Sequence, residues 1–212
     1  MINLLNEYNE MNKALLEEPV PSKYFNDKLA SGIFYNVYPF TLLGDLIKTE
    51  QEPKHHPEGN VWNHTMLVID QCAKYKIYSQ EQKVFMWAGL LHDLGKATAT
   101  KIRKGRITAY EHDKLSKVLA EQFLLEFQED KEFVDKVSRL VRWHMQILYV
   151  LKSLPFAEVE NMLSEVSIEE IALLSLCDRL GRGELTEDKI EVEKKNIGKF
   201  KTYCKSLNLS AK

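Results

Sequence analysis

The stretch AGLLHDLGKATAT, residues 88–100, sets two ionisable groups at the end of an apolar segment. The segment runs up to Leu91, continues with His92 and Asp93, and stops at Gly95. Its pattern places these positions in a protein core, where an unpaired carboxylate is unfavourable by several kcal/mol or loses its charge. The pair therefore needs a buried partner, and the rest of the chain indicates which kind.

The composition is that of a soluble globular protein, with 44% hydrophobic and 28% charged residues in 212. This length suits one domain, or a compact domain with an extra lobe. The net charge of −2 argues against a general nucleic-acid-binding surface, although a local basic patch is compatible with it.

The three cysteines are odd in number and form no C-x-x-C pair, which argues against a disulfide framework or a zinc knuckle. The N-terminal segment MINLLNEYNEMNK lacks the basic and apolar regions of a signal peptide. No apolar run approaches the roughly 20 residues that span a bilayer. We therefore expect a cytoplasmic protein that does not enter a membrane.

Most of the chain has helical periodicity, and the one strand-like stretch is a short hairpin at about 100–110, turning at Lys104-Gly105. Asn60 is expected to cap one helix, and Ser79 with Gln82 to form a capping box for the next. The expected helices span about 2–17, 21–48, 61–77, 80–95, 111–127, 132–150, 155–164, 167–181 and 186–207. The predicted fold class is all-α with one β-hairpin.

Four expected helices place a polar residue on the apolar stripe that faces the core. These residues are His64, His92 with Asp93 beside it, His144, and Asp178. A single histidine in such a place is usually a hydrogen-bonded core residue. The joint pattern instead favours a shared divalent cation, because a cation satisfies imidazoles and carboxylates together.

Arginines offer an alternative partner for the aspartates only. Arg139, Arg142 and Arg179 could neutralise carboxylates but do nothing for neutral imidazoles. Ligands of imidazole and carboxylate without thiolate suit Fe, Mn, Ni, Co or Zn, and Mg is also included among the expected ions. Neighbours on a helix diverge by about 100°, so His92 and Asp93 reach one ion only at a helix end, where Gly95 is expected to loosen the backbone.

The ordered series of these residues resembles the signature of the HD-domain metal-dependent phosphohydrolases. Within that superfamily the chain is most similar to the HD domain of bacterial CCA-adding tRNA nucleotidyltransferases. Three segments carry this resemblance: HHPEGNVWNHTMLVID at 55–70, LLHDLGKATATKIRKGRITAYEHDKLS at 90–116 and LCDRLGRG at 176–183. It covers roughly residues 50–183 and implies an HD-domain helical bundle.

The resemblance also implies ligand roles. The first metal would be held by His64, His92, Asp93 and Asp178. A second ion, as in some HD enzymes, would be held by His112 and His144, with Asp93 bridging. One departure is the turn that usually reads Gly-His-Glu, which here reads Glu111-His112-Asp113.

The nucleotidyltransferase head of those enzymes is not recognisable, because the chain contains no D-x-D motif or Gly-Ser turn of that kind. CCA addition is therefore not expected. The predicted organisation is a helical N-terminal extension packed on the core at 1–48, an HD phosphohydrolase domain at 49–183 and a C-terminal helix at 184–212.

Candidate substrate groups surround the predicted ligands. Asp93 and Lys96 are the expected catalytic residues, and Lys96, Arg179, Arg182 and His56 are expected to contact a substrate phosphate. Lys96 has an alternative role as a solvated lysine that favours a helix dipole. The basic residues at 101–106 would be either an RNA guide or a solvated hairpin.

The predicted function is hydrolysis of phosphoesters of nucleotides or RNA ends, of the 2′,3′-cyclic phosphodiesterase or phosphatase type, by metal-activated water. A rival enzyme on the same scaffold would remove phosphate or pyrophosphate from free nucleotides. A non-catalytic alternative is an HD module that binds a nucleotide or RNA and regulates a partner. The presence of every first-metal ligand favours an enzyme.

Overall fold

The computed structural model describes residues 3–183 and 185–210 of the chain. Residues 1, 2, 184, 211 and 212, at the ends of two expected segments, lie outside the described residues. The long helices of the core are α5 (Val61–Tyr75), α6 (Gln82–Leu91), α8 (His112–Leu125), α9 (Lys131–Trp143) and α12 (Ile168–Leu180). Around them lie α1 (Leu4–Glu17), α2 (Pro21–Ala30), α3 (Ile33–Asn36), α4 (Thr41–Gly44), α7 (Lys96–Ala99), α10 (Gln146–Leu151), α11 (Val159–Glu165), α13 (Glu187–Ser210) and the 3₁₀ turns η1 (Asp45–Lys48) and η2 (Lys76–Tyr78).

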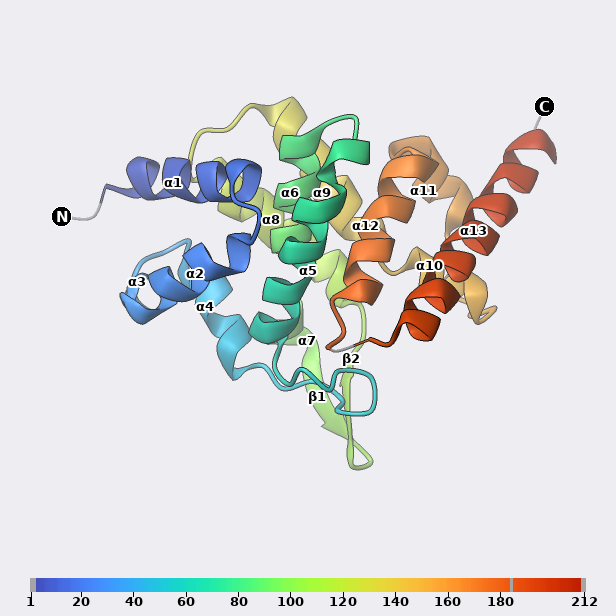
Figure 1. The fold of residues 1–212 in the computed structure, drawn as a ribbon, viewed down its shortest axis with the longest axis horizontal. Helices are drawn as coiled ribbons and strands as arrows, with labels where there is room; N and C mark the ends of the chain where they lie inside the picture. The colour runs from blue at the N-terminus through green and yellow to red at the C-terminus, as the bar shows by residue number, and fades with distance from the viewer. Residues whose placement is uncertain (1–2, 184, 211–212) are drawn as a thin grey trace.

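The fold is all-α with a single two-stranded hairpin among the described residues, as the sequence predicts. Strands β1 (Thr100–Arg103) and β2 (Arg106–Ala109) pair antiparallel, with Thr100 opposite Ala109 and Arg103 opposite Arg106. Lys104 and Gly105 form the turn, and both have positive φ. In Figure 1 the hairpin projects from one edge of the helical body, away from the helices.

Helix α5 lies in the middle of the molecule, with α1 to α4 on one side and α10 to α13 on the other (Figure 1). It packs against α6 and α12, while α8 packs along α9 and α9 against α6. The apolar stripe predicted for α5 is buried, and the Asn60 side chain accepts a hydrogen bond from the Asn63 amide, which confirms the predicted cap. These packed helices hold the predicted ligands in fixed positions.

Several expected helices are shorter than their periodicity suggests. The segment 132–150 breaks after Trp143, and the segment expected at 80–95 ends at Leu91. At both breaks a histidine Nδ1 lies against the carbonyl three residues earlier: His92 against Gly89 at 2.8 Å and His144 against Val141 at 2.7 Å. In a continuing helix, a backbone amide of the next turn would donate to this carbonyl. Because the imidazole ring takes its place, the helix tends to end there.

The capping box expected at Ser79 is wrong. Helix α6 begins after Glu81, without a side-chain cap. Ser79 Oγ instead donates to Glu170 of α12 at 2.8 Å and accepts from the Glu81 amide. The hydroxyl therefore ties the start of α6 to α12, a long-range contact that local sequence does not reveal.

The N-terminal helices share one hydrophobic core with the rest, through buried side chains that include Met11, Leu15 and Phe25. Two tryptophans of the central helices donate to asparagines of this region: Trp62 to Asn26 at 2.9 Å and Trp87 to Asn12 at 3.0 Å. The boundaries between the three segments stay a prediction, because packing does not by itself define them.

None of the helices in the described part of the chain combines the length and apolarity needed to cross a bilayer. Cys72, Cys177 and Cys204 are free thiols and are all buried, so the predicted absence of a disulfide framework holds for them.

Candidate metal centre

Asp93 lies in the turn after α6 and is nearly surrounded by imidazoles. Its Oδ2 is 3.2 Å from His92 Nε2 and 3.7 Å from His64 Nε2. Its Oδ1 is 3.3 Å from His112 Nε2 and 3.7 Å from His144 Nε2. Each carboxylate oxygen therefore faces a different pair of histidines, which is the arrangement that a carboxylate bridging two ions requires.

Asp178 of α12 completes the side of the cluster near His64. Its Oδ1 lies 3.1 Å from His64 Nε2, and Arg182 Nη2 lies 3.3 Å from its Oδ2. Helix α12 comes this close to α5 because residue 181 is a glycine: a Cβ there would lie 2.5 Å from the Val68 side chain and 2.9 Å from its amide nitrogen. The close approach brings Asp178 to the cluster.

Hydrogen bonds fix the tautomers of three imidazoles. The Nδ1 atoms of His92, His112 and His144 lie 2.8, 2.7 and 2.7 Å from the carbonyl oxygens of Gly89, Ala109 and Val141. A carbonyl only accepts, so each Nδ1 carries the proton and each Nε2 presents a lone pair. His112 Nε2 and His144 Nε2 are 3.2 Å apart. A metal cation near these two nitrogens would satisfy both lone pairs.

His64 is oriented by a residue that sequence reasoning missed. Its Nδ1 lies 3.0 Å from Glu58 Oε1 and 3.2 Å from the Gly181 carbonyl oxygen. A carboxylate behind a ligating imidazole fixes the ring and raises its basicity, and such pairs are common at metal sites. Glu58 lies in a turn, where no helical period indicates which way a side chain points. The sequence predicts the turn but not the contact with His64.

The ligand set is buried, at most 5% exposed at any of His64, His92, Asp93, His112, His144 and Asp178. The Nε2 atoms of His64 and His92 and the Oδ1 atom of Asp93 have no hydrogen-bond partner, and Asp93 Oδ2 forms an ion pair with Lys96. Buried polar atoms without partners are rare in folded proteins, and here they converge on common points. Two groups of three residues that could hold an ion share Asp93: His64, His92 and Asp93, and Asp93, His112 and His144.

The charge states suit a divalent cation. Burial opposes ionisation of Asp93, but His92 and Lys96 hold the pKa of its carboxyl well below the usual value. Burial lowers the pKa of His144 to about 3, with further lowering by His112 and His92. An ionised carboxylate beside the neutral imidazole of His144 is a donor set that Fe, Mn, Co, Ni and Zn accept. The residues present therefore fit a divalent ion.

Gly95 has another role than the one expected. Its φ is −66°, an ordinary helical value, so it does not loosen the backbone. A Cβ at this position would lie 2.3 Å from the His112 carbonyl oxygen and 2.6 Å from the Ser116 amide nitrogen. The glycine lets the first turn of α8 approach the turn that bears Asp93, which brings His112 to the carboxylate.

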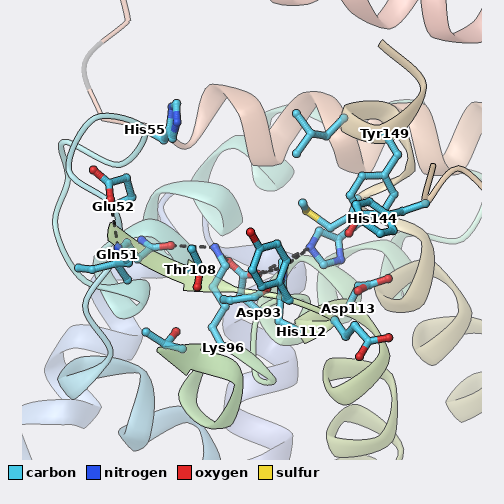
Figure 2. Close-up of a pocket in the computed structure, with 18 of the residues that line it drawn as sticks. Gln51, Glu52, His55, Asp93, Lys96, Thr108, His112, Asp113, His144 and Tyr149 are labelled. Carbon is cyan, nitrogen blue, oxygen red and sulfur yellow. Dashed lines mark hydrogen bonds and ion pairs between the residues drawn. The ribbon is translucent and has the colours of Figure 1, made fainter. Parts of the chain in front are cut away.

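Lys96 begins α7 and points into the cluster, as Figure 2 shows. Its Nζ lies 2.7 Å from Asp93 Oδ2 and 2.8 Å from Gln51 Oε1. The residue is 9% exposed, so the alternative of a solvated lysine is wrong. Gln51 is a second residue that sequence reasoning missed, and it comes from a loop.

A cleft of about 870 Å³ opens onto the cluster. In Figure 2, Lys96 and Asp93 lie between Gln51, Glu52 and His55 on one side and His144 and Tyr149 on the other. The cleft is lined by three of the predicted substrate residues: Lys96, Arg182 and His56.

His56 and Glu58 form a hydrogen-bonded pair beside His64. His56 Nδ1 lies 2.8 Å from Glu58 Oε1. Burial lowers the pKa of His56 to about 4, because its effect is larger than the raising effect of the hydrogen bond to Glu58. Burial opposes ionisation of Glu58, but hydrogen bonds from His56 and His64 lower its pKa to about 2. At neutral pH this is a neutral imidazole donating to a carboxylate.

Arg179 is not brought to the cleft, contrary to the prediction. Its Nε donates to Glu193 of α13. The physical reason is helical phase: one residue after Asp178, the side chain is rotated by about 100° and faces α13 instead.

A family model for the HD domain matches residues 61–183, more than half of the chain and all five segments that carry the ligands. The chain belongs to the HD domain family. The predicted superfamily and fold are thereby confirmed, and this HD domain places its paired His92-Asp93 at the end of α6.

Curated relatives of this HD protein include three with the name multifunctional CCA protein. That of Alkalilimnicola ehrlichii is 32% identical over 140 residues, which is 66% of this chain and 32% of the relative. The protein of Methylococcus capsulatus is 36% identical over 82 residues, 39% of this chain and 18% of the relative. That of Ectopseudomonas mendocina is 30% identical over 113 residues, which is 53% of this chain and 26% of the relative. The chain thus matches a third or less of each relative.

Proposed function

We propose that this HD protein is a metal-dependent phosphohydrolase that cleaves phosphoester bonds of nucleotides or RNA ends, of the 2′,3′-cyclic phosphodiesterase or phosphatase type. The observation that carries the proposal is Asp93, whose two oxygens each face a separate pair of histidines. One ion would be held by His64, His92, Asp93 and Asp178, and a second by Asp93, His112 and His144. Bound divalent ions lower the pKa of water from 15.7 towards about 7 and stabilise charge on phosphoryl oxygens.

The side chains around the cluster have separate roles in this proposal. Asp93 would hold both ions, and the carbonyl-bound imidazoles would direct their lone pairs at them. Lys96, already 2.7 Å from Asp93 Oδ2, supplies a fixed positive charge to a phosphate oxygen. Arg182, at the cleft wall beside Asp178, supplies another. His56 donates from the rim to substrate or to Glu58.

An RNA end is supported as substrate by two features. The relatives are multifunctional CCA proteins by name, and the exposed hairpin beside the cleft carries Lys101, Arg103, Lys104 and Arg106. Basic side chains that track a backbone are the usual means of binding single strands. A cytoplasmic location remains part of the proposal.

Purified protein is expected to carry divalent transition metal, at one or two ions per chain by elemental analysis. It should hydrolyse bis-p-nitrophenyl phosphate and 2′,3′-cyclic AMP, and lose that activity when chelator removes the metal. Activity would then be compared after Mn, Ni, Co or Mg is added back to the metal-free protein. Bound metal without turnover on any phosphoester would support the regulatory binding module instead. Failure to bind any divalent ion would overturn both proposals.

Replacing Lys101, Lys104 and Arg106 together by alanine is expected to raise the KM for an oligonucleotide with a 2′,3′-cyclic phosphate end. The KM for 2′,3′-cyclic AMP should not change. Each lost phosphate contact on a single strand should reduce the salt dependence of log KM by about 0.7. The matched control replaces three exposed lysines of α13: Lys189, Lys195 and Lys199. Equal effects of the two triple variants would mean that the hairpin is not an RNA guide.

A further inference from the structure

One wall of the cleft is aromatic. Its lining beside His144 includes Met145, Leu148, Tyr149 and Phe156. The rings of Tyr149 and Phe156 meet edge to face, with centroids 5.7 Å apart. The opposite side, seen in Figure 2, carries the polar residues Gln51, Glu52 and His55. The cleft thus has an aromatic pair on the side of the ionic centre opposite Gln51, Glu52 and His55.

Phe156 is 54% exposed, yet the loop that carries it is anchored at both ends. The Leu154 amide donates to the Tyr149 carbonyl at 2.8 Å. On the other side, the Glu158 amide donates to Gln146 Oε1 at 2.8 Å, and Arg142 donates to the Glu158 carboxylate at 2.7 Å. An exposed aromatic ring held in a fixed place lowers the entropy cost of binding a ligand.

The aromatic wall is also fixed relative to the ligands. His144 ends α9, and Tyr149 belongs to α10, which starts two residues later. Arg142, in the last turn of α9, pairs with Asp113, the neighbour of His112, and with Glu158 next to the loop. A single buried arginine therefore connects the turn that bears His112 with the loop that bears Phe156.

We propose that Tyr149 and Phe156 form a subsite for the base of a nucleotide whose phosphate lies at the metal centre. This rests on the proposed function, because it assumes that a phosphate occupies the Asp93 cluster. Among phosphoesters, a nucleotide combines a phosphate with a planar ring at short range, and the cleft offers a cationic centre beside aromatic faces. Stacking uses the π-face that every base has, so the subsite should accept purines and pyrimidines alike.

The test separates the two halves of the nucleotide. Adenosine and inorganic phosphate are titrated in turn into the full-length protein by isothermal titration calorimetry. Adenosine is expected to bind the Phe156→Ala variant about 5- to 150-fold more weakly than the unaltered protein, the range for loss of one aromatic stacking partner. Binding of inorganic phosphate should be the same in both. Tyr149→Leu is a second variant with the same expectation.

The matched control is Tyr78→Ala, which removes an aromatic ring that is 69% exposed and does not line the cleft. It should leave the affinity for adenosine unchanged. Adenosine binding that is equal in the Phe156→Ala and unaltered proteins would overturn the subsite, as would affinity no higher than for ribose. Since adenosine has no phosphate, a protein that binds it at Phe156 but cleaves no phosphoester keeps the subsite and refutes only the proposed hydrolysis.

Discussion

Asp93→Asn is expected to lower kcat for 2′,3′-cyclic AMP by about 1,000-fold or more, because two-metal stabilisation contributes several kcal/mol and each 1.4 kcal/mol corresponds to a tenfold rate. The amide is nearly isosteric, but only one of its two terminal atoms can ligate an ion. The other is an NH₂ group facing either His64 and His92 or His112 and His144. The ion that one of these histidine pairs would hold thus loses its carboxylate ligand.

Metal analysis of this variant gives a second readout. The content should fall by about one ion per chain relative to the unaltered protein if two bind. Asp45→Asn provides the matched control, since Asp45 is an exposed aspartate of η1, and it should change neither metal content nor kcat. Undiminished turnover in Asp93→Asn would show that the carboxylate does not hold the ions, and the mechanism would fail.

Gly95→Ala is expected to lower activity strongly through packing alone, without changing a ligand. The added methyl would meet backbone atoms of α8 at 2.3 and 2.6 Å, so α8 or the Asp93 turn must move. Overpacking of this kind costs roughly 1–3 kcal/mol or more in the free energy of unfolding. The movement would also carry His112 away from Asp93, now 3.3 Å apart, and so weaken the site for the second ion.

Thermal unfolding is measured at a fixed metal concentration, and metal affinity by titration. Gly198→Ala is the matched control, because a Cβ there would meet nothing within 4 Å. At this exposed position inside α13, alanine should stabilise the helix by up to about 1 kcal/mol. A Gly95→Ala protein with normal stability and normal metal affinity would contradict the close-packing role given to this glycine.

Helical periodicity was sufficient to predict most of the side chains that converge at the centre, whereas the ligand role of His112 was implied by the family resemblance alone. His64, His92, His144 and Asp178 each replace an apolar residue on a stripe that the structure buries. Burying a polar group without a partner is unfavourable. Polar residues on the buried stripes of several helices therefore indicate a partner that they share. The all-α fold class followed from the same periodicity, since the hairpin is the only β-structure among the described residues.

Loops and side-chain direction could not be predicted in this way. Glu58 and Gln51 contact His64 and Lys96 from turns, where no period relates position to orientation. Arg179 was assigned to the cleft from its place next to Asp178, but adjacent helical residues point about 100° apart. The break after Trp143 depends on an imidazole contact that periodicity does not register.

The position of Asp178 on α12 has a consequence for the newly made protein. The five ligand-bearing segments are spread from α5 to α12, and the last of them reaches the others only where Gly181 lets α12 pack on Val68. During synthesis, the ribosome must release α12 before the first ion can have all of its ligands. On the proposed assignment, a nascent chain therefore lacks a complete metal site until its synthesis has passed this helix.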